Sequence, residues 1–222
     1  MIYTVISIFE ENRITAKNRD CRIIRQPLSL LSEEIKEYIE STGNEKVKAE
    51  RRLAYTTLLC SLKAFFNLDK ISIKRNEYGK PYLSDGDIYI SLSHSEGAVA
   101  VTLSDEGEVG VDLQSEISPE RAERLDKRFF TDLTVKMCDA SICYYFCRLN
   151  EDEAVIESID CPEPAPDSFT SKWAYAESLM KLVGRGFADA SNINEISSQA
   201  KTEVRKIALD KNYCLAVSVE IG

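Results

Sequence analysis

The sequence predicts an α+β protein made of two similar halves, each a small and mostly antiparallel sheet packed with helices. Short runs rich in β-branched and aromatic residues alternate with stretches of helical character, and the order of strand, helix and strand begins again near residue 105. With 222 residues, 44% hydrophobic and 29% charged, the chain can bury a substantial core. We therefore expect an N-terminal half at residues 1–105 and a C-terminal half at 106–222.

The N-terminal half begins with a strand. Residues 2–9, IYTVISIF, are β-branched and aromatic. Two helices are expected next, at 28–41 and 45–66, and the second carries most of its apolar residues toward its C-terminal end. The turn signals EYGKP and HSEG then separate three short apolar runs. These runs predict strands at 71–75, 87–93 and 97–103.

The C-terminal half begins with a strand at 108–113, within SDEGEVGVDLQ. Its remaining predicted elements are helices at 119–129 and 168–183 and strands at 201–209 and 213–220. Between the two helices, residues 138–167 form an insertion, in which CYYFCRL and AVIESI suggest a hairpin and CPEPAPD a proline-stiffened linker. Because loops tolerate insertions, we expect this segment to be a solvated excursion.

Composition excludes several classes of function. The 28 Lys and Arg against 37 Asp and Glu give a net charge of −9, which argues against nucleic acid as a partner. A single histidine excludes zinc sites built on several histidines. No apolar run suits a membrane span, and the opening MIYTVISIFEENR lacks the marks of a signal peptide. Seven cysteines without a CxxC pair suggest free thiols in a reducing compartment, so we expect a cytoplasmic protein without a membrane partner. We also expect a monomer.

The strand EVGVDLQ holds the first candidate site. Strand alternation puts its three apolar side chains on one face and Asp112 and Gln114 on the other. Carboxylate and amide oxygens suit Mg²⁺, which keeps several waters and shares ligands with substrate phosphates. The alternative is a solvated strand edge that carries polar residues.

The helix KWAYAESLMKLVGRG holds the second candidate site. Trp173, Glu177 and Lys181 are spaced by four residues, so they form a row along one side of the helix. A carboxylate then lies one turn from an ammonium group. The alternative is an ordinary Glu–Lys helix pair, which stabilises a helix by a few tenths of a kcal/mol.

The third candidate combines NEYGKPYL with YISLSHSEG. Lys80, Ser93 and His94 are donors suited to phosphate oxygens, and Pro81 fixes the turn beside Lys80. A turn or capping role is the alternative for His94. A Ser–His nucleophile pair is disfavoured, because adjacent residues of a strand point to opposite faces.

Taken in order, YGKPYL, ISLSHS, VGVDLQ, RFF and WAYAESLMKLVGRGF resemble the motifs of the 4'-phosphopantetheinyl transferases, specifically the larger surfactin-synthetase-activating type. The resemblance runs from about residue 45 to 187. It implies two pseudo-twofold-related halves with the active site in the cleft between them. It also implies transfer of the phosphopantetheine arm of coenzyme A to a serine of an acyl or peptidyl carrier protein, with Mg²⁺ or Mn²⁺ bound and adenosine 3',5'-bisphosphate released.

The resemblance also implies roles for individual residues. Asp112 and Glu177 match the metal-binding acids, with Gln114 beside them as a third ligand, and Glu177 would act as the base for the incoming serine. Lys181 matches a contact to the pyrophosphate. The remaining matches are coenzyme A contacts, namely Arg52, with Arg51 as its alternative, Lys80, Pro81, Ser93 and His94.

Three departures from the family pattern bear on activity. Gln114 stands where many members carry an acid, Ala176 stands where many carry a lysine, and TDLT follows RFF where a glutamate is common. Lys172, one turn before Ala176, is a candidate to replace the missing cation. Two alternatives to an active transferase therefore remain: a degenerate relative that binds coenzyme A or a carrier protein without transfer, and an unrelated binding module.

Overall fold

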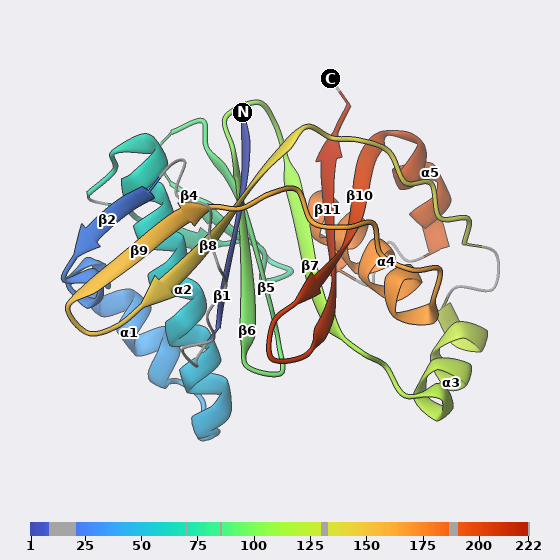
Figure 1. Cartoon of the computed structure of the whole chain (residues 1–222), viewed down its shortest axis with the longest axis horizontal. Coiled ribbons are helices and arrows are strands. Elements are labelled where there is room, and N and C mark those ends of the chain that lie inside the picture. The colour runs from blue at the N-terminus through green and yellow to red at the C-terminus, as the bar shows by residue number, and fades with distance from the viewer. Residues whose placement is uncertain (9–20, 70, 85, 130–132, 187–190, 222) are drawn as a thin grey trace.

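The α+β class is confirmed in the computed structural model, which describes residues 1–8, 21–69, 71–84, 86–129, 133–186 and 191–221 (Figure 1). The strands are β1 Ile2–Ile8, β2 Cys21–Arg25, β3 Ile73–Arg75, β4 Pro81–Leu83, β5 Tyr89–Ser95, β6 Ala98–Ser104, β7 Val109–Ser115, β8 Ile142–Leu149, β9 Glu153–Ser158, β10 Ala200–Ala208 and β11 Asn212–Glu220. The helices are the 3₁₀ turn η1 Pro27–Leu30 and the α-helices α1 Glu33–Glu40, α2 Glu45–Phe66, α3 Pro119–Phe129, α4 Phe169–Val183 and α5 Ile193–Ser198.

The expected helix at 28–41 is divided in two. Pro27 opens η1, and Leu31 after it is extended, so the backbone leaves the helical conformation. Ser32 then starts α1 as its N-cap, because its side chain accepts the amide of Ile35. Asn44 caps α2 in the same way, and α2 has the bounds that the sequence predicts.

The elements stack in four layers. A six-stranded sheet in the order β2-β9-β8-β1-β6-β5 packs against a three-stranded sheet in the order β10-β11-β7. Helices α1 and α2 cover the outer face of the first sheet, and α4 and α5 cover the outer face of the second (Figure 1). A separate two-stranded sheet, β3-β4, lies beside the first layer.

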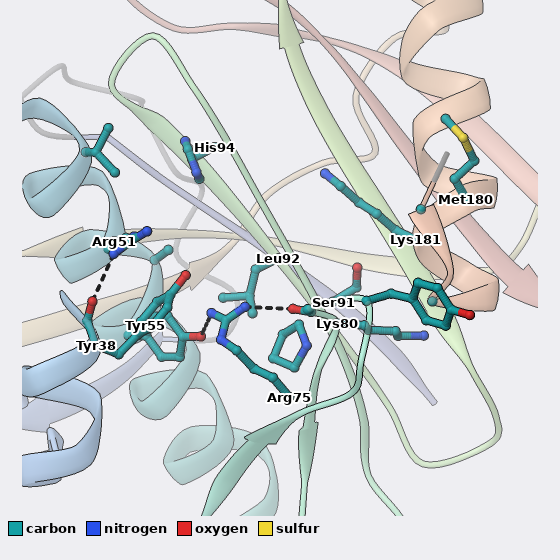
Figure 2. Close-up of a pocket in the computed structure, with 17 residues that line it drawn as sticks. Tyr38, Arg51, Tyr55, Arg75, Lys80, Ser91, Leu92, His94, Met180 and Lys181 are labelled. Atoms are coloured by element: carbon teal, nitrogen blue, oxygen red, sulfur yellow. Dashed lines mark hydrogen bonds between the residues drawn. The ribbon is translucent and has the colours of Figure 1, made fainter. Parts of the chain in front are cut away.

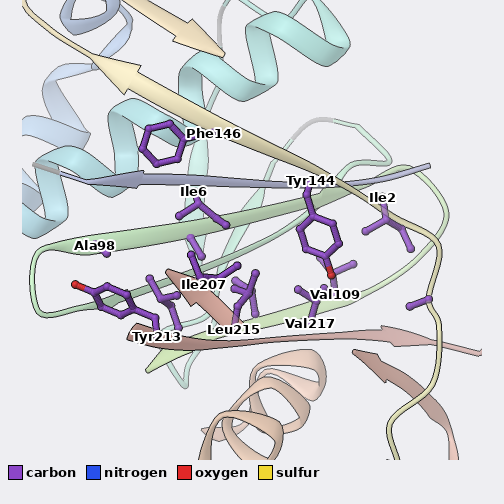
Figure 3. Packing of buried hydrophobic residues seen from close by; sticks show 14 of the residues in the cluster. Ile2, Ile6, Ala98, Val109, Tyr144, Phe146, Ile207, Tyr213, Leu215 and Val217 are labelled. Atoms are coloured by element: carbon purple, nitrogen blue, oxygen red, sulfur yellow. The ribbon is translucent and has the colours of Figure 1, made fainter. Parts of the chain in front are cut away.

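The core between the two sheets is apolar and fully enclosed. Ile6 of β1, Phe146 of β8 and Leu215 of β11 meet there, each at most 2% exposed (Figure 3). The three apolar residues of β7 face this core, as strand alternation predicts, while its other face is turned to α4. Burial of this size is the main stabilising contribution to the fold.

The insertion at 138–167 is not a solvated excursion, which corrects the sequence-based expectation. Its hairpin, β8 and β9, lies inside the six-stranded sheet, with β8 parallel to β1. Tyr144 and Phe146 face the inter-sheet core, and Cys147 faces α2. The run of four consecutive buried residues in ICYYFCRL, from Tyr144 to Cys147, explains this placement, because a strand with apolar side chains on both faces needs a layer on each side.

A row of serines on β5 joins the two sheets where β5 meets β7, a contact that we call the β5–β7 seam. The hydroxyls of Ser91, Ser93 and Ser95 accept the backbone amides of Val111, Leu113 and Ser115, at 3.0, 3.0 and 3.1 Å. Side chains on one face of a strand recur at every second residue. The backbone amides that point outward from the edge of a neighbouring strand also recur at every second residue. The serine spacing therefore satisfies edge amides that burial would otherwise leave without partners.

Gly110 lets α4 lie directly on β7. A Cβ atom at this position would be 2.0 Å from the carbonyl oxygen of Ser178 and 2.4 Å from the amide nitrogen of Leu182. Both contacts are with helix backbone, so no side-chain rotation could relieve them. The close approach brings the next residue on that face of β7, Asp112, level with the last turns of α4.

None of the helices in the described part of the chain combines the length and the apolar character that crossing a bilayer requires.

Candidate functional site

Asp112 and Lys181 form the centre of the site. The Lys181 ammonium donates to Oδ1 of Asp112 at 2.7 Å and to the Ser93 hydroxyl at 2.9 Å, and Ser93 donates to the same Oδ1 at 2.9 Å. The Asp112 side chain is 7% exposed. Its second oxygen, Oδ2, is buried and has no hydrogen-bond partner among the described residues. A buried carboxylate oxygen without a partner is costly, which makes Oδ2 a candidate ligand atom.

Glu177 is the second carboxylate of the site. Burial and, to a lesser extent, the neighbouring charge of Asp112 raise its pKa to about 6, while Lys181 opposes the increase. Two acids and one ammonium group therefore share a largely enclosed space. Such a cluster carries a net negative charge at neutral pH, and it can hold a proton or a cation.

A pocket of about 330 Å³ opens beside this cluster (Figure 2). Three residues that the sequence predicts for the site line this pocket, namely Lys80 just before β4, His94 of β5 and Lys181 of α4. Arg51 of α2, the alternative to Arg52, lines it as well. Pro81 also lines it, beside Lys80. Helix α4 thus contributes both to the carboxylate cluster and to the pocket wall, so a ligand in the pocket reaches the cluster at Lys181.

His94 faces the pocket with one ring nitrogen engaged. Nδ1 lies 2.9 Å from Oε2 of Glu50, whose side chain is 7% exposed, while the His94 side chain is 45% exposed. The carboxylate holds a hydrogen on Nδ1, which orients the ring and leaves Nε2 for another partner. The turn interpretation of His94 is therefore insufficient, because a buried acid of α2 fixes the ring.

Lys80 ties the β3–β4 turn to the end of α4. Its ammonium donates to Glu108 at 2.5 Å and to the carbonyl of Leu182 at 2.7 Å. Asn76 of the same turn donates to the carbonyl of Gly184, the C-cap of α4, at 2.8 Å. GKP therefore builds one wall of the pocket by holding the last turn of α4, and the Lys80 charge is partly used in doing so.

Arg52 and Arg51 differ in their surroundings. Arg52, the first choice from sequence, pairs with Glu40 at 3.0 Å with its side chain 56% exposed. Arg51 lines the pocket, donates to the carbonyl of Tyr38 at 2.9 Å and stacks on the Tyr38 ring at 4.3 Å. The alternative left open by the sequence is thus the residue with access to the pocket.

Among the pocket residues that the sequence analysis missed are three with polar groups, Tyr38, Tyr55 and Arg75. The Arg75 guanidinium lies 4.0 Å from the Tyr38 ring centroid, donates to the carbonyl of Gly79 at 2.7 Å and hydrogen-bonds to the Tyr55 hydroxyl (Figure 2). A signal for Arg75 existed, since it precedes the NEYGKP turn by one residue. Tyr38 and Tyr55 lie on two helices, and only tertiary packing brings them to the turn.

Ser93, Gln114 and Lys172 have less direct relations to the pocket. Ser93 is 4% exposed and forms hydrogen bonds with Asp112 and Lys181 from within the β5–β7 seam. The half-buried Gln114 donates its amide to the carbonyl of Ser115 at 3.1 Å, which leaves its amide oxygen as the group suited to a cation. Lys172 pairs with Asp126 of α3 at 2.6 Å, so it does not replace a cation at the buried Ala176.

A cation would therefore depend on few protein ligands. The described residues contain no group of three or more histidine, cysteine, aspartate or glutamate side chains able to hold a metal ion. Asp112 and Glu177 supply two carboxylates, and Gln114 adds one amide oxygen. Such a set fits Mg²⁺, which keeps waters and takes substrate phosphate oxygens as ligands.

Parts of two motifs lie outside the described residues. These are Phe130 of RFF, Phe187 at the end of WAYAESLMKLVGRGF, and residues 131–132, near the position of the family glutamate. Neither a scan against protein-family models nor a search of curated proteins finds a match for this chain.

Proposed function

We propose that this protein transfers the 4'-phosphopantetheine group of coenzyme A to a serine of an apo acyl or peptidyl carrier protein. The observation that carries the proposal is the junction at Lys181. This residue lines a pocket with basic groups and also bonds to a buried carboxylate whose second oxygen has no partner among the described residues. A pyrophosphate ester needs both, a cationic pocket for its anionic end and a charge-neutralising centre at the reacting phosphorus.

The proposal assigns each side of the pocket a part of the ligand. Arg51, Arg75 and His94 would bind the phosphate on the nucleotide, and Lys181 would bind the pyrophosphate. The pocket walls come from both predicted halves of the chain, Lys80 from the first and Met180 from the second. This supports the further proposal that the two halves, which the family resemblance implies are related by a pseudo-twofold axis, hold the ligand between them.

The chemistry proceeds by attack at phosphorus. The carrier serine oxygen forms a bond to the phosphorus that bears the pantetheine arm, and the bond from this phosphorus to the bridging pyrophosphate oxygen breaks. Glu177 takes the serine proton, directly or through water, and adenosine 3',5'-bisphosphate leaves with the bridging oxygen. In the metal-free protein the pKa of Glu177 is raised to about 6, so this carboxylate is mostly ionised at pH 7 and able to accept a proton.

The residues present fit a divalent cation. Asp112 Oδ2 is a buried acceptor without a partner among the described residues, Glu177 lies close enough for its pKa to respond to Asp112, and Gln114 is on the same face of β7. We propose that these residues hold Mg²⁺ or Mn²⁺. The bound cation would supply charge neutralisation to the pyrophosphate oxygens. Lys181, which already binds Asp112, would remain beside the same oxygens.

The proposed setting is the cytoplasm, with the protein acting as a monomer. All seven cysteines are free, and Cys60, Cys147 and Cys214 are buried, which suits a reducing compartment. The protein partner supplies the nucleophile. With a net charge of −9, the protein would repel an acidic carrier overall, so docking would depend on apolar contacts and a local basic patch.

The test is a transfer assay read by intact mass. The protein is incubated with coenzyme A, Mg²⁺ and a panel of apo carrier proteins, and we expect the mass of at least one carrier to increase by one phosphopantetheine group. A carrier with its serine changed to alanine is the substrate control. Asp112→Asn should abolish transfer, whereas Glu37→Gln, an exposed change on α1, should not. No transfer to any carrier would refute the proposal.

A second candidate is a relative that binds coenzyme A without transfer. The observation that favours it is the position of Gln114, whose neutral amide already bonds to the Ser115 carbonyl and weakens the cation site relative to a third carboxylate. Coenzyme A binding in a calorimeter without transfer to any carrier would support this candidate over the first.

A further inference from the structure

The SLSHS strand is more than a source of ligand contacts. Its three serines face the same side and each accepts one amide of β7. Ser93 alone makes further hydrogen bonds to charged groups of the site, to Asp112 and to Lys181. Ser95, by comparison, contacts only Ser115, through its backbone amide and its hydroxyl, in the hydrogen bonds found among the described residues.

The hydrogen-bond capacity of the Ser93 hydroxyl is fully used. A hydroxyl has one hydrogen and two lone pairs. The lone pairs accept from the Leu113 amide at 3.0 Å and from the Lys181 ammonium at 2.9 Å, so the hydrogen is directed to Asp112 Oδ1 at 2.9 Å. The backbone of β7 thereby fixes an oxygen atom between the two charged side chains.

This arrangement decides which oxygen of Asp112 is available. Oδ1 accepts from both Ser93 and Lys181, while Oδ2 remains buried without a partner among the described residues. Without the Ser93 hydroxyl, Oδ1 would lose one of its two donors and Lys181 one of its two acceptors. The carboxylate could then rotate and turn either oxygen toward the ammonium group.

We infer that Ser93 is a positioning residue, which uses the β5–β7 seam to hold Asp112 with Oδ2 free and Lys181 beside it. The positioning role itself is argued from these hydrogen bonds, and only its purpose in phosphopantetheine transfer rests on the proposed function. The match of Ser93 to a coenzyme A contact is thereby replaced by a role behind the site, consistent with its 4% exposure. Groups that orient a metal ligand in this way typically change metal affinity or activity by about 10- to 100-fold when removed.

The test compares Ser93→Ala with Ser95→Ala. Both remove a hydroxyl that accepts one β7 amide, so both should lower the melting temperature. Mn²⁺ affinity is measured by calorimetry in the presence of coenzyme A. We expect a fall of about 10- to 100-fold for Ser93→Ala and little change for Ser95→Ala. Ser93→Thr, which keeps the hydroxyl, should recover most of the affinity. If Ser93→Ala does not fold, Ser93→Cys takes its place and should also lower the Mn²⁺ affinity, because a thiol is a weak donor and acceptor.

The outcomes separate the inference from the proposed function. Equal Mn²⁺ affinities in wild type, Ser93→Ala and Ser95→Ala would overturn the positioning role, even if the wild type transfers phosphopantetheine. Weaker Mn²⁺ binding in Ser93→Ala would support the role even if no carrier is modified. A wild type that binds no Mn²⁺ under either condition, with or without coenzyme A, would overturn the positioning role together with the cation site.

Discussion

Replacing Glu177 by glutamine should stabilise the metal-free protein at neutral pH. The ionised Glu177 carboxylate is largely buried and lies near Asp112, and these two causes raise its pKa from 4.5 to about 6, although Lys181 opposes the increase. The folded state therefore binds this proton more tightly than the unfolded state. An amide of nearly the same shape carries no charge, so Glu177→Gln removes the destabilisation while keeping the packing.

The magnitude follows from the two pKa values. The interval from 4.5 to about 6 corresponds to about 2 kcal/mol at about 1.4 kcal/mol for each pH unit. Because the folded pKa is raised, stability falls as pH rises through this interval and is constant above it. The variant should thus be more stable than wild type by about 1 to 2 kcal/mol at pH 7.5, and by about 0.8 kcal/mol or less at pH 5. For a chain of this size, about 2 kcal/mol corresponds to roughly 4–8 °C in melting temperature.

The assay is thermal unfolding, monitored by calorimetry at several pH values from 5 to 8, after metals have been removed with EDTA. Glu37→Gln, an exposed glutamate in α1, is the matched control and should leave the melting temperature unchanged throughout. Added Mn²⁺ with coenzyme A should stabilise wild type more than the variant, since a cation needs the carboxylate. The reasoning would be refuted if Glu177→Gln were no more stable than wild type at pH 7.5, or if its gain did not shrink as pH falls.

Three further predictions concern the pocket, the cation and the packing of α4. Arg75→Gln should raise the KM for coenzyme A with less effect on kcat, because Arg75 is remote from the reacting phosphorus; unchanged KM in steady-state kinetics would remove it from the binding site. Gln114→Glu should raise Mn²⁺ affinity in the absence of coenzyme A, by calorimetry, and equal affinities would show that this side chain is not a ligand. Gly110→Ala should lower the free energy of unfolding, measured with urea, by about 3 kcal/mol or more, because its Cβ would lie 2.0 Å from helix backbone. Gly107→Ala is the control and should hardly change this free energy, because its nearest contact would be at 3.8 Å.

Local pattern was enough to predict most of the elements. Helices α2 and α3 have their predicted bounds, and the alternation in VGVDLQ correctly assigned the two faces of β7. The short strands β2 and β4 and the helix α5 were missed, because segments of three to six residues carry little periodic signal. The position of β8 inside the sheet was also missed, since the parallel pairing of β1 and β8 joins residues far apart in the chain.

Motif spacing located the candidate site only in part. It singled out Asp112, Glu177 and Lys181, and the structure brings these three together. It did not find Arg75, and of the two adjacent arginines that fit one motif position it put Arg52 first, whereas Arg51 is the one that lines the pocket. That choice depends on the rotation of α2 against α1, where Tyr38 stacks on one arginine, and no local pattern specifies it.

The serine spacing in SLSHS links the fold to the site. Strand alternation turns its serines toward β7 and leaves His94 on the other side, against Glu50 of α2. A shift of β5 by one residue would exchange these faces and break all three bonds between serine hydroxyls and β7 amides. The register of β5 is therefore fixed by the same bonds that place Ser93 between Asp112 and Lys181. His94 on one side of the strand and the carboxylate cluster on the other are thus held at a constant separation, which a ligand that spans the pocket from His94 to Lys181 requires.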